Sequence, residues 1–230
     1  MPRRSRLSLP DVPHHVIQRG NNRDACFYAD EDYQCYLQWL EEYAALCGCA
    51  VHAYVLMTNH VHLLVTPDSA HGLGDLMKRL GQRYVQYINR TYRRSGTLWE
   101  GRFKSCLTAE EDYILACSRY IEMNPVRAAM LEHPAEYRWS SYRVNAQGET
   151  SDLLIPHAVY LRLGSDEKGR QAAYRALFHR EMDGLLLEEI RQATNGNYAL
   201  GSQRFVEQVE YALGRRASRG MPGRPANKQH

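Results

Sequence analysis

Two kinds of hydrophobic spacing alternate along the first 147 residues of the chain. Residues 14–20, 51–57, 60–65 and part of 97–107 carry the short apolar runs typical of β-strands, with a tight turn at 58–59. Residues 30–48, 72–94 and 109–124 carry apolar side chains at helical spacing. We expect Thr108 and Glu111 to form a capping box that opens the third helix, and Pro125 to end it.

This order of elements predicts an α+β fold. Strand, helix, two strands, helix, strand and helix are typical of a ferredoxin-like antiparallel sheet with helices on one face. Past about residue 148 the pattern becomes wholly helical, in two or three segments interrupted at Gly184 and at 195–197. We therefore expect an α+β domain over residues 1–147, a helical C-terminal extension over 148–214 and a basic, disordered tail over 215–230.

Composition adds three exclusions. The 230-residue chain is 44% hydrophobic, which is enough for a core, yet no apolar run approaches the length of a membrane helix. The N-terminus lacks the apolar segment of a secretory signal, so we expect a cytoplasmic protein without a membrane partner. The six cysteines contain no C-x-x-C pair, which argues against a structural zinc site.

Basic residues are concentrated, although the net charge is only +3. Between positions 78 and 104 there are eight lysines and arginines against one acid, which indicates a polyanionic partner, and an ordinary solvated face is the alternative. A second basic zone begins at 215, where residues 222–225 read Pro-Gly-Arg-Pro, close to a minor-groove hook but better suited to non-specific phosphate binding. The candidate DNA-binding residues are Arg19, Lys78, Arg79, Arg83, Arg90, Arg94, Arg102, Lys104, Arg119 and Arg127.

His60 and His62 stand two apart in an otherwise apolar strand. Side chains alternate along a strand, so both imidazoles project from one face while Val61 and Leu63 project from the other. Two neutral imidazoles on one face can bind a divalent metal ion. In a chain with ten histidines such a triplet also arises by chance, and a hydrogen-bonded pair is the alternative.

Tyr120 and Asn124 lie on the third predicted helix, about 40° apart around its axis. The apolar stripe of Ile114, Cys117 and Ile121 runs beside them, so the phenol of Tyr120 could reach the sheet. Most of the sixteen tyrosines must be packing residues, and position alone does not distinguish Tyr120 from them.

The motifs "LMTNHVHLLV", "GRFKS" and "RYIEMNPVRA", in this order and followed by "WSSYR", resemble the REP-associated tyrosine transposases, a group of single-tyrosine HUH transposases. The resemblance covers about residues 10–145. It implies that His60 and His62 bind a divalent ion, that Tyr120 is the nucleophile, and that Asn124 completes the metal site unless Pro125 turns it away.

The resemblance further implies a Mg²⁺- or Mn²⁺-dependent enzyme that cuts and rejoins single-stranded DNA hairpins through a 5′-phosphotyrosine intermediate, acting at the nucleoid as a monomer or homodimer. Palindromic repeats are the expected substrate class. Two alternatives remain: a nucleic-acid-binding regulator that has lost cleavage, and a zinc hydrolase, for which no third-ligand motif is present.

Overall fold

The computed structural model of the chain describes residues 6–219. The Pro-Gly-Arg-Pro segment and the rest of the predicted tail from residue 220 lie outside the described residues. Residues 215–219 are described, and Ala217 is buried. Its N–H donates to the carboxylate of Glu210, in the helix α9 (Gln203–Leu213), at 2.8 Å.

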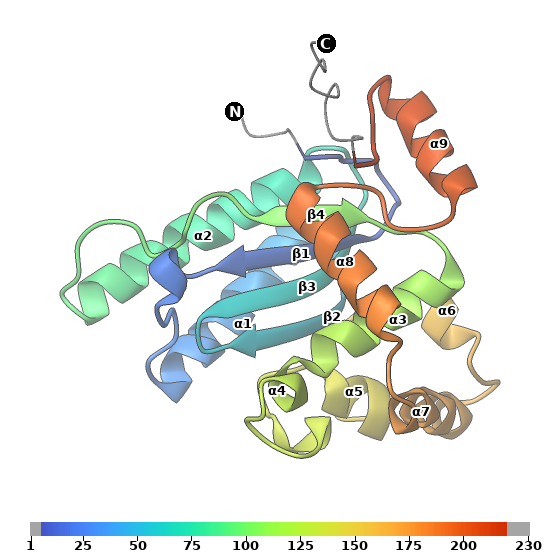
Figure 1. Ribbon diagram of the computed structural model, residues 1–230. Helices are drawn as coiled ribbons and strands as arrows, with labels where there is room; N and C mark the ends of the chain where they lie inside the picture. Colours follow the sequence, from blue (N-terminus) through green and yellow to red (C-terminus); the bar gives the residue numbers. More distant parts are fainter. Residues whose placement is uncertain (1–5, 220–230) are drawn as a thin grey trace, which may run out of the picture.

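Four antiparallel strands form one sheet in the order β2-β3-β1-β4 (Figure 1). They are β1 (His14–Arg19), β2 (Cys49–Met57), β3 (His60–Pro67) and β4 (Lys104–Leu107). The predicted α+β, ferredoxin-like sheet is confirmed, including the tight turn between β2 and β3.

The two faces of the sheet are covered by different helices. The helices α1 (Asp30–Leu46) and α2 (Gly72–Thr91) pack together behind the sheet, as Figure 1 shows. The helices α3 (Glu111–Glu122) and α8 (Gly184–Gly196) cross the front. The prediction had helices on one face only, whereas the structure also has α3 and α8 on the other face. That face carries His60 and His62, since Tyr120 of α3 contacts His62.

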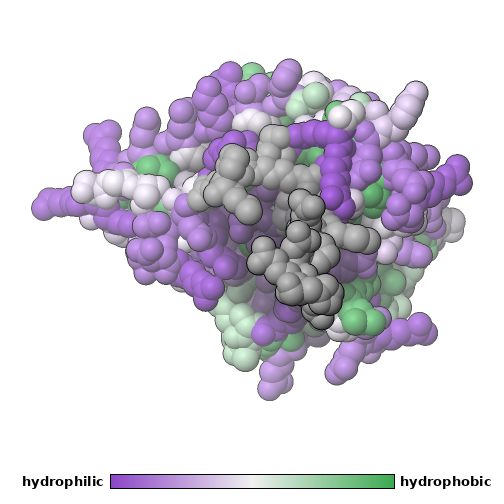
Figure 2. Space-filling model, turned by 45° about the horizontal axis from the view of Figure 1, so that its top comes forward, coloured by the Kyte–Doolittle hydropathy of each residue, from purple (hydrophilic) through white to green (hydrophobic). Residues whose placement is uncertain are grey.

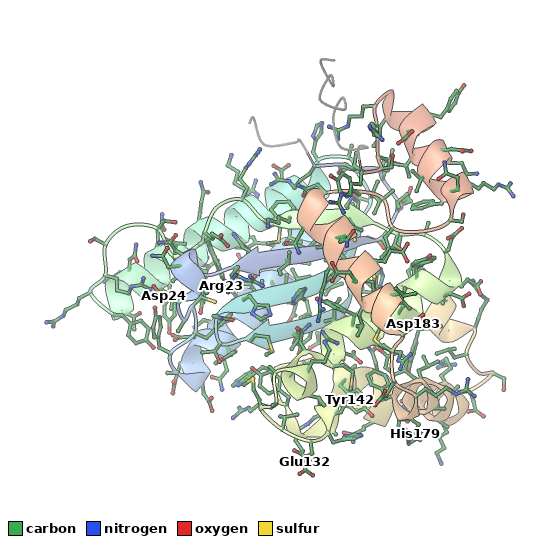
Figure 3. The ribbon with its side chains drawn as sticks, in the orientation of Figure 1. Arg23, Asp24, Glu132, Tyr142, His179 and Asp183 are labelled. Atoms are coloured by element: carbon green, nitrogen blue, oxygen red, sulfur yellow. The ribbon has the colours of Figure 1, made fainter. Side chains whose placement is uncertain are left out.

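The remaining elements are one short turn between β1 and α1 and the helices that follow α3. They are η1 (Asn21–Arg23), α4 (Asn124–Arg127), η2 (Pro134–Glu136), α5 (Tyr142–Gln147), α6 (Ala158–Leu161), α7 (Glu167–Ala176), η3 (Leu177–His179) and α9 (Gln203–Leu213). Tyr142 of α5 lies near η3, where His179 is labelled in Figure 3, and its ring packs 4.8 Å from that of Phe178. Leu107 at the end of β4 forms a parallel β-bridge with Ala199, so the segment after α8 lies along the outer edge of the sheet.

The predicted capping box at the start of α3 is wrong. Thr108 lies just beyond β4, and its N–H donates to the carbonyl of Pro13 at 2.9 Å, which continues the pairing of β4 with β1. The helix begins at Glu111 with Glu110 as N-cap, and the Glu110 carboxylate accepts from the backbone N–H of Ser202 at 2.6 Å. A contact between distant segments therefore replaces the local motif.

Hydrophilic side chains cover most of the face in Figure 2, and apolar side chains form separate patches on it. Among residues 6–219, no helix is long and apolar enough to span a membrane.

Glu122 anchors α3 to the helices that follow it. Its carboxylate is fully buried and accepts hydrogen bonds from Ser141 Oγ (2.5 Å), Asn145 Nδ2 (2.9 Å) and Tyr174 OH (2.8 Å). Burial raises the pKa of Glu122 to about 7, against the three hydrogen bonds, which lower it. The C-terminal end of the helix that carries Tyr120 is thus held by a polar cluster in a dry interior.

This cluster predicts a pH-dependent difference between the protein and its Glu122→Gln variant. The folded pKa is about 7, above that of an unfolded glutamate, so ionisation between these values destabilises the folded state as the pH rises. From pH 5 to pH 8 the free energy of unfolding of the wild type should fall relative to Glu122→Gln by about 2 kcal/mol. Urea titrations at both pH values measure this difference. Glu132→Gln, at an exposed carboxylate, is the control. The prediction would be contradicted if the free energy of unfolding changed equally with pH in the wild type and in Glu122→Gln.

Candidate active site

His60 and His62 lie at the start of β3 and face the same side of the sheet. Their ring centroids are 5.1 Å apart and the ring planes are nearly perpendicular, at 83°. Antiparallel partners share a face, and Ile17 of β1 stands opposite His62. Leu63, the residue after His62, projects from the opposite face of the sheet and is fully buried in the core.

The protonated nitrogen of His60 follows from its neighbour Asn59. The Asn59 amide nitrogen donates to the carbonyl of Arg23 at 3.0 Å, so its oxygen faces His60 Nδ1 at 2.6 Å. That oxygen accepts the Nδ1 proton, which leaves the Nε2 lone pair of His60 available to an ion.

His62 is held by a residue that the sequence analysis missed. His15 of β1 is buried, and its Nε2 lies 2.8 Å from His62 Nδ1. The two ring centroids are 5.0 Å apart and the ring planes are inclined by only 20°. The signal in the sequence was the pair His14-His15 in a predicted strand, but only the register with β3 shows which of the two faces His62.

Tyr120 packs against both of these histidines within the same chain. Its ring centroid lies 5.4 Å from that of His15 and 5.6 Å from that of His62, in edge-on contacts, and Tyr120 is 7% exposed. Cys117 and Ile121, on the adjoining side of α3, are fully buried and hold the helix against the sheet. The structure therefore brings the predicted nucleophile and the predicted metal ligands together.

Asn124 remains in helical geometry despite the proline that follows it. It begins the short helix α4, where Pro125 occupies the first turn and its missing N–H costs nothing. The amide nitrogen donates to the carbonyl of Tyr120 at 3.0 Å, so the amide oxygen points elsewhere. Burial lowers the pKa of His60, and a hydrogen bond with the Asn124 side chain, which lies within range of the imidazole, acts in the opposite direction.

Arg127 lies over the Tyr120 ring, with its guanidinium carbon 4.2 Å from the ring centroid. One terminal nitrogen donates to the Tyr120 carbonyl at 2.7 Å, and the other is buried and has no hydrogen-bond partner among the described residues. Burial lowers the pKa of Arg127 to about 10, so the side chain stays charged at neutral pH. An unpaired guanidinium nitrogen at this place can bind a phosphate oxygen.

Burial keeps the imidazoles neutral. It lowers the pKa of His60 to about 4 and that of His15 to about 3, and it holds the pKa of His62 well below its usual range. The positive charge of Arg127 acts in the same direction on all three. The neutral form is the one that binds metal ions.

These donors fit a divalent ion with open coordination positions. Two imidazole nitrogens and an amide oxygen suit Mn²⁺ or Mg²⁺ better than a closed zinc site, since zinc sites usually add a third histidine, a thiolate or a carboxylate. Within residues 6–219, no group of three or more histidine, cysteine, aspartate or glutamate side chains is placed to hold a metal.

The family model "Transposase IS200 like" matches residues 8–124, which include both histidines, Tyr120 and Asn124. The chain belongs to the IS200-like transposase family. No curated protein sequence matches it.

Two solved structures are similar to this transposase-family chain. One is described as a REP-associated tyrosine transposase bound to a REP hairpin, with 14% identity and a TM-score of 0.56 over 68% of this chain and 93% of that one. The other is described as a transposase from Deinococcus radiodurans, with 22% identity and a TM-score of 0.38 over 52% of this chain and 95% of that one. At this identity the first match supports the fold alone.

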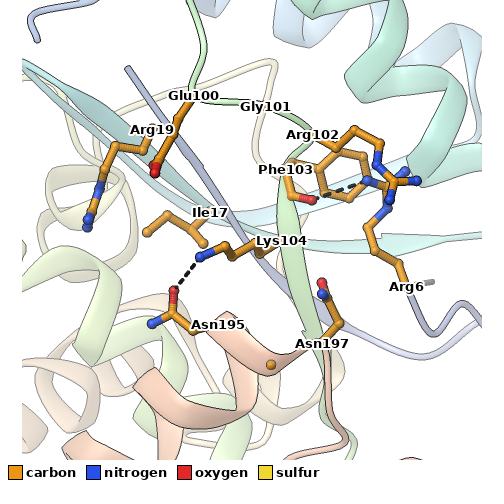
Figure 4. Close-up of a pocket in the computed structure, with 11 residues that line it drawn as sticks. Arg6, Ile17, Arg19, Glu100, Gly101, Arg102, Phe103, Lys104, Asn195 and Asn197 are labelled. Atoms are coloured by element: carbon orange, nitrogen blue, oxygen red, sulfur yellow. Dashed lines mark hydrogen bonds between the residues drawn. The ribbon is translucent and has the colours of Figure 1, made fainter. Parts of the chain in front are cut away.

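A basic pocket lies beside the histidine face of this transposase (Figure 4). Its volume is ≈ 350 Å³, and Arg19, Arg102 and Lys104 line it together with Ile17 of β1. Lys104 reaches across to Asn195 of α8, where its ammonium donates to the amide oxygen at 3.1 Å. A wider groove of ≈ 920 Å³ adjoins it and is lined by Lys78, Arg102 and α2.

The other predicted basic residues differ in whether they have partners within the chain. Lys78, Arg79 and Arg90 are exposed on α2. The remaining three have partners within the chain. Arg83 pairs with the Glu42 carboxylate at 2.9 Å, Arg94 donates to the Tyr28 hydroxyl, and Arg119 donates to the carbonyl of Arg180.

The aromatic residues beside this groove are largely packed. Trp99 is stacked on Tyr84 with ring centroids 6.0 Å apart, and both Trp99 and Phe103 are buried. The Arg6 guanidinium covers the Phe103 ring at 3.7 Å. In this structure both residues therefore pack against other side chains and are not presented for stacking on unpaired bases.

Proposed function

We propose that the chain is a metal-dependent single-stranded DNA endonuclease and strand transferase that uses Tyr120 as its nucleophile. The observation that carries this proposal is the contact of Tyr120 with His62, at 5.6 Å between ring centroids, within one chain. Membership of the IS200-like transposase family supports DNA cutting and joining as the activity. Because one chain contains the histidines and the tyrosine, a monomer can hold a complete site, and a homodimer is not required for it.

In the proposed reaction the phenolic oxygen of Tyr120 forms a bond to phosphorus and the bond to the 3′-oxygen breaks. The phenol loses a proton and the leaving 3′-oxygen gains one, so atoms and charge balance. The product is a 5′-phosphotyrosine with a free 3′-hydroxyl, and attack by a second 3′-hydroxyl reverses the step and joins strands. A bound divalent ion would polarise a phosphate oxygen during this exchange.

The chain's own residues account for the other needs of this chemistry. His60 and His62 would hold Mg²⁺ or Mn²⁺ through Nε2, and Asn124 would add its amide oxygen. Arg127 would bind the phosphate through its unpaired nitrogen while its ring contact keeps Tyr120 oriented. Tyr120, already packed between a histidine and a guanidinium, needs little reorganisation to attack.

A DNA hairpin formed by a palindromic repeat is the proposed substrate. The similar REP-associated tyrosine transposase is described as bound to a REP hairpin. The pocket with Arg19, Arg102 and Lys104 lies next to the histidine face and could bind the phosphates of an unpaired strand that leads from the hairpin to Tyr120.

The first prediction of this proposal concerns the nucleophile. Tyr120→Phe should abolish the covalent protein–DNA adduct that forms on a labelled hairpin oligonucleotide with Mn²⁺, because the phenolic oxygen is the atom that bonds to phosphorus. Denaturing gels detect the adduct. Tyr113→Phe, on the same helix, is the matched control and should form the adduct as the wild type does. Hairpin binding without an adduct in the wild type, under either metal, would instead favour the regulator, and a tightly bound zinc with Tyr120 dispensable would favour the hydrolase.

The second prediction concerns Asn124. Removing its amide oxygen in Asn124→Ala should weaken Mn²⁺ binding at least about tenfold, since one of three protein ligands is lost. Titration calorimetry of the metal with the full chain measures the affinity. Asn89→Ala, at the C-terminal end of α2, is the control, and equal affinities in the two variants would show that Asn124 does not bind the ion.

The third prediction separates the basic residues of the pocket from a basic residue that pairs with an acid. Replacing Arg102 and Lys104 by glutamine should weaken single-stranded DNA binding and reduce the slope of log K against log salt by about 1.4, at about 0.7 for each phosphate contact. Fluorescence anisotropy at several salt concentrations measures the slope. Arg83→Gln should leave it unchanged, because Arg83 already pairs with Glu42. If Arg83→Gln lowers the slope as much as a pocket residue does, the DNA follows α2 instead.

A further inference from the structure

Thr194 of α8 is buried against the histidines of the active site. Its Oγ1 lies 3.0 Å from His15 Nδ1, and His15 Nε2 lies 2.8 Å from His62 Nδ1. Thr194, His15 and His62 are 3%, 1% and 3% exposed. The three side chains therefore form a chain of hydrogen bonds, shielded from water, that ends at a proposed metal ligand.

The direction of these hydrogen bonds follows from the single proton of the Thr194 hydroxyl. Thr194 donates it to the carbonyl of Ile190, one turn earlier in α8, at 2.7 Å. The Cys106 sulfur lies 3.3 Å from the same hydroxyl oxygen, and burial raises the thiol pKa to about 12, so Cys106 stays protonated and can donate to that oxygen. Toward His15 the hydroxyl oxygen can then only accept, and the proton of the neutral His15 ring is on Nδ1.

The assignment continues to His62. With its proton on Nδ1, neutral His15 presents the lone pair of Nε2, which accepts from His62 Nδ1–H. The proton of His62 is therefore on Nδ1, and its Nε2 carries a lone pair. His60 reaches the same state through Asn59, so both imidazoles present Nε2 lone pairs on one face of β3.

We propose that Thr194 and His15 are positioning residues of the active site: the Thr194 hydroxyl sets the tautomer of His15, which holds the Nε2 lone pair of His62 ready for the divalent ion. This inference rests on the proposed metal-dependent function. It gives α8 a part in the metal site although the family match ends at residue 124. Outer hydrogen bonds of this kind orient metal-binding histidines and raise their affinity.

The test replaces the hydroxyl by a methyl group of similar size, in Thr194→Val. Without an acceptor at position 194, a proton on His15 Nδ1 would be a buried, unpaired donor, so the ring should take the other tautomer. His15 Nε2–H would then donate to His62 Nδ1, and the proton of His62 would move to Nε2, where it blocks the ion. The Mn²⁺ affinity of the full chain, measured by titration calorimetry, should fall about tenfold in Thr194→Val and stay within about twofold in Thr194→Ser, which keeps the hydroxyl.

Nitrogen-15 NMR of the metal-free protein reports the tautomers directly. In the wild type, His15 and His62 should both carry the proton on Nδ1, and in Thr194→Val both should carry it on Nε2. A wild-type His62 protonated on Nε2 would overturn the inference without any variant, as would a folded Thr194→Val protein with wild-type tautomers or wild-type Mn²⁺ affinity. His15→Gln offers His62 an acceptor that needs no hydroxyl, so adding Thr194→Val to it should change the affinity by less than about twofold.

The outcomes separate this inference from the proposed function. If the wild type does not bind Mn²⁺, the proposed metal-dependent function fails, and the NMR spectra still decide the tautomers. If the wild type binds Mn²⁺ and Thr194→Val binds it equally well, only the role of Thr194 and His15 fails.

Discussion

The antiparallel pairing of β1 with β3 is the constraint on which the active site depends. Ile17 stands opposite His62 and His15 opposite Leu64, so His15 and both histidines of β3 lie on one face. A slip of one residue in this pairing would put the imidazole of His15 among the apolar side chains under α1 and α2. The register is therefore fixed by the same hydrophobic core that Val61, Leu63 and Val65 of β3 build on the opposite face.

The helices on the histidine face exclude water from the site, and this exclusion determines the protonation state of the imidazoles. Covered by α3 and α8, His15 and His62 are buried and His60 is half-buried. All three imidazoles stay neutral at physiological pH, which favours metal binding over protonation. Burying polar groups is costly unless each is hydrogen-bonded. Asn59 and Thr194 supply those bonds from the two sides of the histidine set. One Arg127 nitrogen is buried and has no hydrogen-bond partner within residues 6–219, which is expected where a ligand supplies the missing acceptor.

The sequence predicted the parts of this arrangement that depend on short-range periodicity. Alternation placed His60 and His62 on one face, and helical spacing placed Tyr120 beside Asn124. It could not show that His15 rather than His14 faces His62, because this depends on strand register, nor that Thr194 reaches a residue 179 positions away in the chain. The capping box at Thr108 failed for the same reason, since Ser202 binds the carboxylate of Glu110 and the sheet binds the backbone of Thr108. Arg83 looked like part of a phosphate track, and its acid, Glu42, lies on another helix.

The contacts of α8 explain how a helix so late in the chain can contribute to a site built on the first two thirds. The short edge strand β4 leaves backbone groups that need partners, and the segment after α8 provides them. Asn197 accepts from the Ser105 N–H through its side chain at 3.1 Å, and Leu200 donates its N–H to the Leu107 carbonyl at 2.8 Å. One hydrophobic cluster also joins Ile190 of α8 to the strands of the sheet. Because the cluster and the backbone bonds hold α8 on β4, the Thr194 hydroxyl is positioned by the rigid sheet, as a group that orients a metal-binding imidazole must be.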